Sequence, residues 1–140
     1  MCAYTETTET TVTQRNTDLV RRLFDAFTDN DAAEIDRLLG PGFTAHGLPP
    51  QLGEGAAAIK ASAAMMHGGL RDCRCEMDDV IAEGDRVAVR YTARATHVGE
   101  LFGVPPSGRN VTITGIEIYR VDAGAIVEYW GVGDFSDVTG

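Results

Sequence analysis

Basic residues are scarce in this chain of 140 amino acids, which has 12 Lys and Arg against 21 Asp and Glu and a formal net charge of −9. A phosphate backbone or an anionic membrane surface would on average repel such a chain. The composition therefore argues against nucleic acid and membrane surfaces as partners.

Long hydrophobic runs are also missing. The longest apolar stretches fall far short of the ~20 residues of a membrane helix, and the N-terminus has neither the basic nor the apolar region of a secretion signal. We therefore expect a soluble, cytoplasmic protein. The length suits one globular domain with a sizeable core.

Cysteine and histidine are too few, and too badly spaced, for a disulfide scaffold or a metal centre. The three Cys are an odd number, and Cys73 and Cys75 are too close along a strand to bridge easily. The three His, at positions 46, 67 and 97, fall on different expected elements without a ligand spacing. We expect reduced thiols and no metal site.

Several catalytic signatures are absent as well. The chain contains no Gly-x-Gly-x-x-Gly, no Gly-x-x-x-x-Gly-Lys, no His-Glu-x-x-His and no Gly-x-Ser-x-Gly. Nucleotide hydrolysis and the commonest serine hydrolase arrangement therefore lose most of their support.

The first half of the chain has helical periodicity. Residues 1–15 show none and are expected to form a disordered tail before a single domain over 16–140. Further helices are expected at about 32–39 and 56–67, with a brief strand at 43–46 between them. The first helix follows the tail and has apolar side chains at helical spacing, namely Val20, Leu23, Phe24 and Phe27.

The second half changes to runs rich in β-branched and aromatic residues, separated by turn residues. Helices followed by a meander of long strands indicate an α+β fold, with helices on one face of a curved antiparallel sheet. The expected strands cover about 74–82, 86–97, 110–121 and 125–134.

One carboxylate lies within an apolar strand. Glu117 has Ile116 and Ile118 beside it and Ile113 nearby, so both faces of its strand are apolar. A carboxylate in that position is either paired or held in a cavity with a raised pKa. Tyr119 adds aromatic surface on the same strand, as either core packing or part of a substrate site.

Other polar residues have two interpretations each. His46 precedes a proline loop and is either a general acid or base at a cavity mouth or an exposed loop residue. Alternation places Arg90 on a polar strand face, opposite Tyr91, although it could also clamp a substrate. Asp134 ends the last strand as a surface charge or an assisting acid, and Met66 either fills the core or lines a pocket floor.

The residues at 96–108, 111–121 and 126–130 resemble the SnoaL-like polyketide cyclase, or ester cyclase, family. The resemblance spans about residues 16–134. It implies the nuclear-transport-factor-two-like fold, a cone of curved sheet closed by helices, whose open end holds a mostly apolar ligand. It also implies a homodimer formed through the convex face of the sheet, and aldol ring closure of a polyketide ester without metal or cofactor.

When the family's functional residues are matched to this sequence, the sequence differs from the family pattern. The family's acid/base Asp follows the Trp of the last strand, and that position is Gly131 here. The family's partner His corresponds to Glu117. The resemblance to limonene epoxide hydrolases would place Arg90 in the pocket, which a bulge could reconcile with strand alternation.

The leading hypothesis is a cofactor-independent enzyme that acts on a hydrophobic, polyketide-like or polycyclic intermediate by acid/base cyclisation or isomerisation. The alternatives are a cofactor-free hydroxylase, an epoxide or lactone hydrolase, and a protein that only binds a hydrophobic ligand or a partner protein. The expected catalytic residues are Glu117, His46 and Asp134. The expected substrate-binding residues are Phe24, Met66, Arg90, Tyr91, His97, Tyr119, Tyr129 and Trp130.

Overall fold

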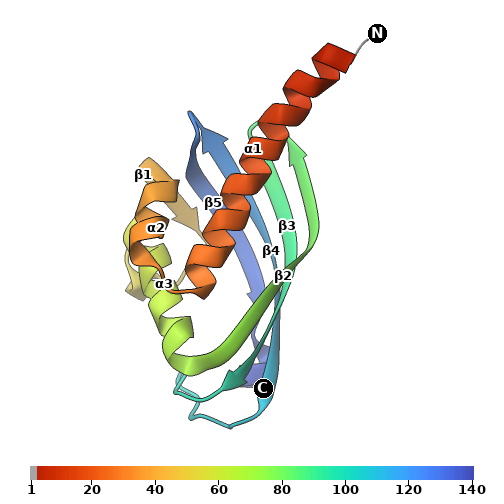
Figure 1. The fold of residues 1–140 in the computed structure, drawn as a ribbon. Helices are drawn as coiled ribbons and strands as arrows, with labels where there is room; N and C mark the ends of the chain where they lie inside the picture. Colours follow the sequence, from red (N-terminus) through yellow and green to blue (C-terminus); the bar gives the residue numbers. More distant parts are fainter. Residues whose placement is uncertain (1–2) are drawn as a thin grey trace.

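Five strands form one curved, open sheet in the computed structural model, which describes residues 3–140 and, for side chains, residues 11–140. The spatial order of the strands is β1-β5-β4-β3-β2, and Figure 1 shows the curvature. The strands are β1 (Leu39–His46), β2 (Leu70–Glu83), β3 (Arg86–His97), β4 (Asn110–Asp122) and β5 (Ala125–Asp134).

Helices cover one face of this sheet. Figure 1 shows α1 running across that face, while α2 and α3 lie towards β1. The predicted α+β cone is thereby confirmed. The helical elements are α1 (Ala3–Thr28), α2 (Ala32–Leu38), the 3-10 turn η1 (Pro50–Leu52), α3 (Gly55–Gly69) and α4 (Ser136–Thr139).

The sheet departs from the antiparallel expectation at one edge. Strands β2 to β5 pair antiparallel, as predicted, but β1 pairs parallel with β5 through Ala45 opposite Tyr129 and His46 opposite Trp130. The long connection through α3 and the three following strands allows the two strands to run in the same direction. His46 therefore lies beside the last strand.

The first helix begins at Ala3, although a disordered tail was expected over residues 1–15. The difference arises because α1 is anchored by its buried C-terminal half, and adding residues to an existing helix costs far less than starting one. Gln14 also donates a hydrogen bond to Asp18 one turn later, at 2.9 Å. Residues 1–2 lie outside the described part of the chain.

The short helix α4 was not predicted, because it has no hydrophobic periodicity of its own. It is held instead by its contacts with the start of β4. The Asp137 carboxylate accepts a hydrogen bond from the Thr112 backbone N–H at 2.6 Å, and Val138 is buried. This helix therefore depends on tertiary contacts that a sequence pattern does not report.

Strand β2 bends where its pairing with β3 is interrupted. The register shifts between Arg71 and Arg74 and again between Met77 and Asp79, and Asp72 has a φ of 55°. Such bulges increase local twist and bend a strand. The bent strand curls towards the helices and helps to enclose space between sheet and helices.

Two groups of buried apolar residues lie in the space that the curved sheet and helices enclose. The larger joins the helices to the sheet through residues such as Val20, Ile35 and Ile126. The smaller includes Leu70, Leu101 and other residues near the chain reversals at the opposite end. The solid core is therefore divided, which leaves room for a cavity.

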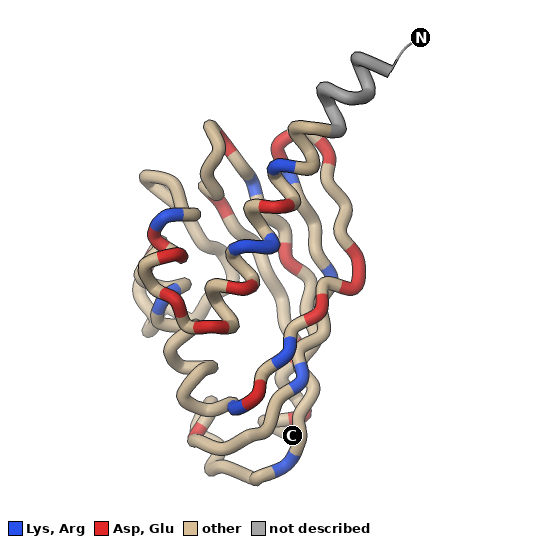
Figure 2. The backbone as a smooth tube through the Cα atoms, viewed as in Figure 1, with Lys and Arg blue, Asp and Glu red and all other residues tan. Residues whose placement is uncertain are grey.

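Charged residues are spread along the helices and strands, and Figure 2 shows residues of both signs along α1 and α2. Among residues 3–140, no helix is long and apolar enough to cross a membrane.

Candidate active site

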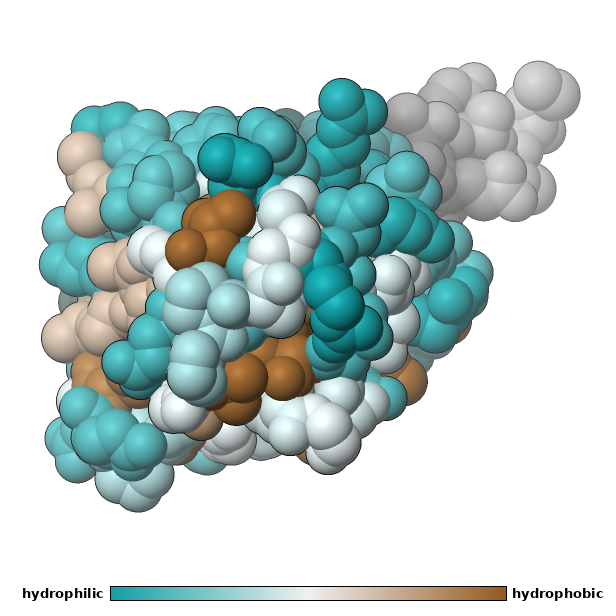
Figure 3. All heavy atoms as spheres, turned by 90° about the horizontal axis from the view of Figure 1, so that it is seen from below, coloured by the Kyte–Doolittle hydropathy of each residue, from teal (hydrophilic) through white to brown (hydrophobic). Residues whose placement is uncertain are grey.

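A cavity of about 770 Å³ lies between the helices and the concave face of the sheet. Its volume falls in the range of ligand sites, and its walls are mostly apolar. Figure 3 views the end of the molecule where α3 meets β2 and shows apolar side chains among hydrophilic ones. Part of the apolar content of the chain therefore lines a cavity rather than a solid core.

Glu117 points into this cavity from β4. Its strand neighbours across the sheet are Val89 on β3 and Gly131 on β5. Because side chains alternate along a strand, Ile116 and Ile118 face outward, where both are exposed. The sequence left open whether this carboxylate is paired or held in a cavity, and in the structure Glu117 lines the cavity.

Two tyrosines hold the Glu117 carboxylate. The Tyr119 hydroxyl donates a hydrogen bond to Oε1 at 2.5 Å, and the Tyr129 hydroxyl donates one to Oε2 at 2.9 Å. The two strands bring these side chains together because Tyr119 and Tyr129 are register partners. Each carboxylate oxygen therefore has a fixed donor, and the plane of the group is set.

Burial raises the pKa of Glu117 above its ordinary value, and the two tyrosine hydrogen bonds oppose that rise. The same burial, together with the negative charge of Glu117, raises the pKa values of Tyr119 and Tyr129. The tyrosines therefore remain protonated donors at neutral pH, while the carboxylate is a stronger base than an exposed one.

The absence of a side chain at position 131 is what admits the Tyr129 hydroxyl. A Cβ built on Gly131 would overlap that hydroxyl and would also lie 2.6 Å from Tyr129 Cζ. An acidic side chain at 131 and a tyrosine reaching Glu117 from 129 therefore exclude each other. In this chain, Tyr129 therefore occupies the space that glycine leaves free at position 131.

The aromatic wall continues beyond the carboxylate. The Phe24 ring meets the edges of Tyr91 and Tyr119, with centroid distances of 5.6 and 6.2 Å. Tyr91 lies over Gly115, its partner on β4, so that its hydroxyl is 2.5 Å from the point a Cβ would occupy. Glycine at 115 thus allows the Tyr91 ring to lean along the cavity wall.

Sulfur-containing side chains line another part of the cavity, where Met65 and Met66 of α3 lie with Cys73 and Cys75 of β2. Burial raises the pKa of Cys75 to about 12. A thiol with that pKa is a poor nucleophile at neutral pH. This wall therefore supplies polarisable contact surface rather than covalent chemistry.

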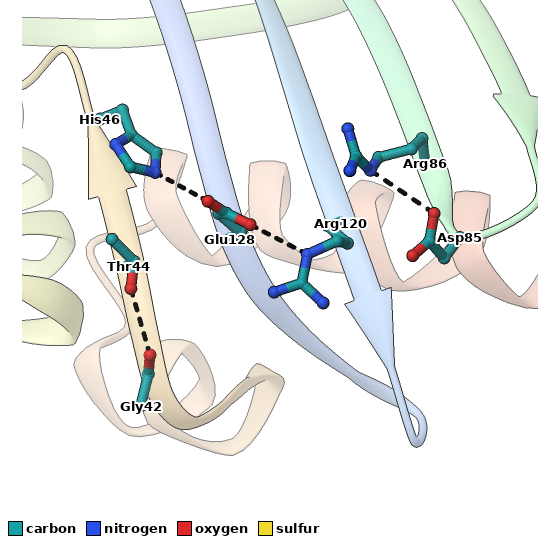
Figure 4. A network of polar contacts seen from close by, with 7 residues as sticks. All are labelled: Gly42, Thr44, His46, Asp85, Arg86, Arg120 and Glu128. Carbon is teal, nitrogen blue, oxygen red and sulfur yellow. Dashed lines mark hydrogen bonds and ion pairs between the residues drawn. The ribbon is translucent and has the colours of Figure 1, made fainter.

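His46 and Trp130 lie outside the cavity, on the outer face of the sheet. Their rings stack at 5.2 Å with an interplanar angle of 15°, and Arg86 lies over Trp130. The Glu128 carboxylate contacts His46 Nε2 at 2.8 Å and accepts a hydrogen bond from Arg120 at 2.9 Å, as Figure 4 shows. The structure therefore separates both residues from Glu117.

Three other expected site residues also lie away from the cavity. Arg90 is on the outer face and binds Asp79 at 2.8 Å, in agreement with strand alternation. Asp134 is exposed and accepts a hydrogen bond from the Ser136 backbone N–H at 2.9 Å. His97 is buried at the base of the loop after β3, where Nδ1 lies 3.2 Å from Ser107 Oγ.

Six of the expected site residues line the same cavity, namely Phe24, Met66, Tyr91, Glu117, Tyr119 and Tyr129. Cys73 and Cys75 also line it and were not expected there. The alternation of Cys73 and Cys75 was a usable signal, but the bulges in β2 reset which face its residues occupy. Within the part of the chain that the structure describes, no cluster of His, Cys, Asp or Glu is arranged to hold a metal ion.

A mostly apolar cavity with one carboxylate deep inside it, within a cone-shaped α+β fold, is typical of a site that binds small molecules. The sequence profile described as SnoaL-like polyketide cyclase matches residues 17–139, and the chain belongs to this family. No curated protein sequence matches the chain.

Solved structures agree with this assignment. IdmH from Streptomyces antibioticus, a candidate polyketide cyclase, is 28% identical, with a TM-score of 0.76 over 89% of this chain and 95% of that one. AclR from Streptomyces galilaeus, a candidate hydroxylase, is 27% identical, with a TM-score of 0.74 over 87% and 80%. TsrD from Streptomyces laurentii shares the fold at 23% identity, with a TM-score of 0.79 over 89% and 91%.

Proposed function

We propose that this protein is a cofactor-independent enzyme that removes a proton from a carbon next to a carbonyl group in a hydrophobic, polyketide-like substrate. The observation that carries the proposal is the Glu117 carboxylate, which faces an apolar cavity while Tyr119 and Tyr129 hold its two oxygens. A positioned carboxylate with a raised pKa is suited to this kind of proton transfer.

The reaction begins when Glu117 takes the proton from the acidic carbon. The C–H electron pair forms a C=C bond, and the carbonyl π electrons move to oxygen to give an enolate. In a cyclisation, the enolate carbon attacks a second carbonyl carbon of the same molecule and forms the new C–C bond. The resulting alkoxide takes up a proton, which Glu117 can return, so that the product is an isomer of the substrate.

Proton removal can be tested without the natural substrate. In D2O, 2-tetralone exchanges the hydrogens next to its carbonyl, and NMR measures the rate. We expect the protein to accelerate exchange and Glu117→Gln to reduce that acceleration by about 100-fold or more, since general base catalysis is worth about 10² to 10⁴. Glu128→Gln, an outer-face glutamate on the neighbouring strand, is the control and should retain exchange.

The proposal is wrong if Glu117→Gln exchanges the ketone as fast as the unchanged protein. It is also wrong if the unchanged protein binds 2-tetralone without accelerating exchange. That second outcome would favour a binding protein.

A second candidate is oxygen insertion, because the chain resembles AclR at 27% identity. Isotope labelling separates the candidates. A hydroxylase places oxygen from labelled O2 in its product, a hydrolase places oxygen from labelled water, and a cyclase incorporates neither.

The outer face of the sheet supports a further proposal, that the protein forms a homodimer. Ile81, Ile116 and Ile118 are exposed on this face. Charges of both signs flank them, including Asp79 with Arg90 on one side. A two-fold axis would cover the apolar strip and bring opposite charges together, as isologous interfaces do.

A further inference from the structure

Tyr91 differs from the two tyrosines that bind Glu117. Its ring lines the cavity from β3 and is half-buried. Among the described side chains, Tyr119 and Tyr129 both donate to Glu117, whereas the Tyr91 hydroxyl has no hydrogen-bond partner. Tyr91 therefore presents a free hydrogen-bond donor to whatever occupies the cavity.

The Tyr91 ring is held in place on two sides. The edge of Phe24 packs against it with an interplanar angle of 70°, and its hydroxyl lies over Gly115. Burial, and then the charge of Glu117, raises the pKa of Tyr91, so its proton stays on oxygen at neutral pH. A fixed donor in an apolar cavity is the arrangement that stabilises developing negative charge.

The hydrogen-bond donor and the base face neighbouring positions on the same side of β4. Gly115 and Glu117 are two residues apart on the same face of β4, so their Cα atoms are separated by about 7 Å along the strand. Tyr91 lies over the first position, and Glu117 extends from the second. Tyr91 and Glu117 therefore face neighbouring positions of one cavity wall.

We propose that Tyr91 donates the hydrogen bond that holds the carbonyl oxygen as it becomes negative while Glu117 takes the proton. This inference rests on the function proposed above. In the step, the carbon proton moves to a Glu117 oxygen, the C–H electron pair moves towards the carbonyl oxygen, and Tyr91 keeps its own proton.

The same arrangement assigns the substrate class as uncharged ketones or esters. Among the lining residues, Arg71 is the only Lys or Arg, and it is exposed where α3 meets β2. A carboxylate ligand would add negative charge near Glu117 without a buried cation to offset it. We expect a carboxylic acid to bind at least tenfold more weakly than its methyl ester.

The hydrogen bond can be measured directly on bound 2-tetralone, labelled with ¹³C at the carbonyl carbon. We expect infrared difference spectra to show the carbonyl band of the bound ketone at lower frequency than in an apolar solvent. Tyr91→Phe should move the band back towards the apolar value and slow hydrogen exchange by about 100-fold, the cost of losing one such donor. Glu117→Gln should reduce the acceleration of exchange by about 100-fold or more and keep the lowered band.

Ser62→Ala is the matched comparison, because Ser62 is another cavity hydroxyl without a described hydrogen-bond partner, on the helical wall. The inference is overturned if Tyr91→Phe keeps the lowered band, or if Ser62→Ala alone removes it. Loss of exchange in Glu117→Gln alongside an unchanged band in Tyr91→Phe would reject the donor and leave the proposed base in place.

The substrate class is tested separately by calorimetric titration with 2-naphthoate and its methyl ester. Equal or tighter binding of 2-naphthoate would overturn the assignment to uncharged ligands.

Discussion

The buried carboxylate of Glu117 makes the folded protein less stable as pH rises. Its pKa is raised by burial, so between the ordinary glutamate pKa of about 4.3 and the raised value the folded protein holds a proton that the unfolded chain has released. The free energy of unfolding must therefore fall as pH rises through that interval. The loss is about 1.4 kcal/mol for each unit by which the pKa is raised.

We expect Glu117→Gln to remove this loss, because glutamine carries no charge. Urea unfolding at pH 5 and pH 8 would then show a smaller decrease in the variant than in the unchanged protein. Glu128 supplies the opposite comparison, since hydrogen bonds from His46 and Arg120 lower its pKa and its contribution to stability is lost as pH falls. An equal decrease in Glu117→Gln and the unchanged protein would contradict the prediction.

The pair formed by Tyr129 and Gly131 makes a second prediction at the residue scale. Gly131→Ala forces a Cβ into the space of the Tyr129 hydroxyl, and overpacking of this kind costs about 1–3 kcal/mol. In a Tyr129→Leu background the same change should cost much less, which a double-mutant cycle measured by urea unfolding would reveal.

Gly68 provides the matched control for that substitution. It lies in α3, and a Cβ built there meets nothing within 4 Å, so Gly68→Ala should be neutral or stabilising by up to about 1 kcal/mol. Additive effects of the changes at 129 and 131 would show that the two positions are independent.

At the scale of elements, the alternation of side chains along a strand was the sequence pattern that best predicted which face a residue occupies. It placed Glu117 in an apolar strand and Arg90 on the polar face. The same pattern could have shown that Tyr129 and Trp130 do not both line the cavity, because adjacent residues face opposite sides of β5. Only Tyr129 lines the cavity.

Elements that depend on contacts between residues far apart in the sequence could not be predicted from alternation. The β2 bulges hid the cavity-facing side of Cys73 and Cys75, and α4 depends on the bond between Asp137 and Thr112. The start of α1 was missed because its first turns extend a helix anchored further along. In each case the structure depends on residues that lie outside the short stretch of sequence from which the prediction was made.

The cap of α2 allows a prediction for an element. The Asp31 side chain accepts a hydrogen bond from the Glu34 backbone N–H at 3.1 Å. Asp31→Ala should lower the free energy of unfolding by about 1 kcal/mol, the usual cost of losing such a cap. Asp36→Ala removes only an ion pair with Lys60, with both side chains part-exposed, and should cost less than about 0.5 kcal/mol in the same urea titration. Equal costs would show that the cap is unimportant.

For the whole molecule, the outer face of the sheet sets the expected assembly. Ile118 lies in a row across the strands with Ala88 and Trp130. We expect Ile118→Glu to convert a dimer into monomers, because it places a charge in the buried strip, and light scattering after size-exclusion chromatography would show the change in mass. Val12→Glu changes another exposed apolar residue, on α1, and should leave the mass unchanged. A monomeric unchanged protein would contradict the proposal.

The position of Trp130 decides what optical spectroscopy can observe in this protein. It is the single tryptophan of the chain, and it stacks on His46 with Arg86 above it, on the face of the sheet opposite the cavity. Its emission therefore responds to whatever covers the outer face of the sheet. Occupancy of the cavity, in contrast, is reported by the absorbance and vibrational bands of the tyrosines around Glu117.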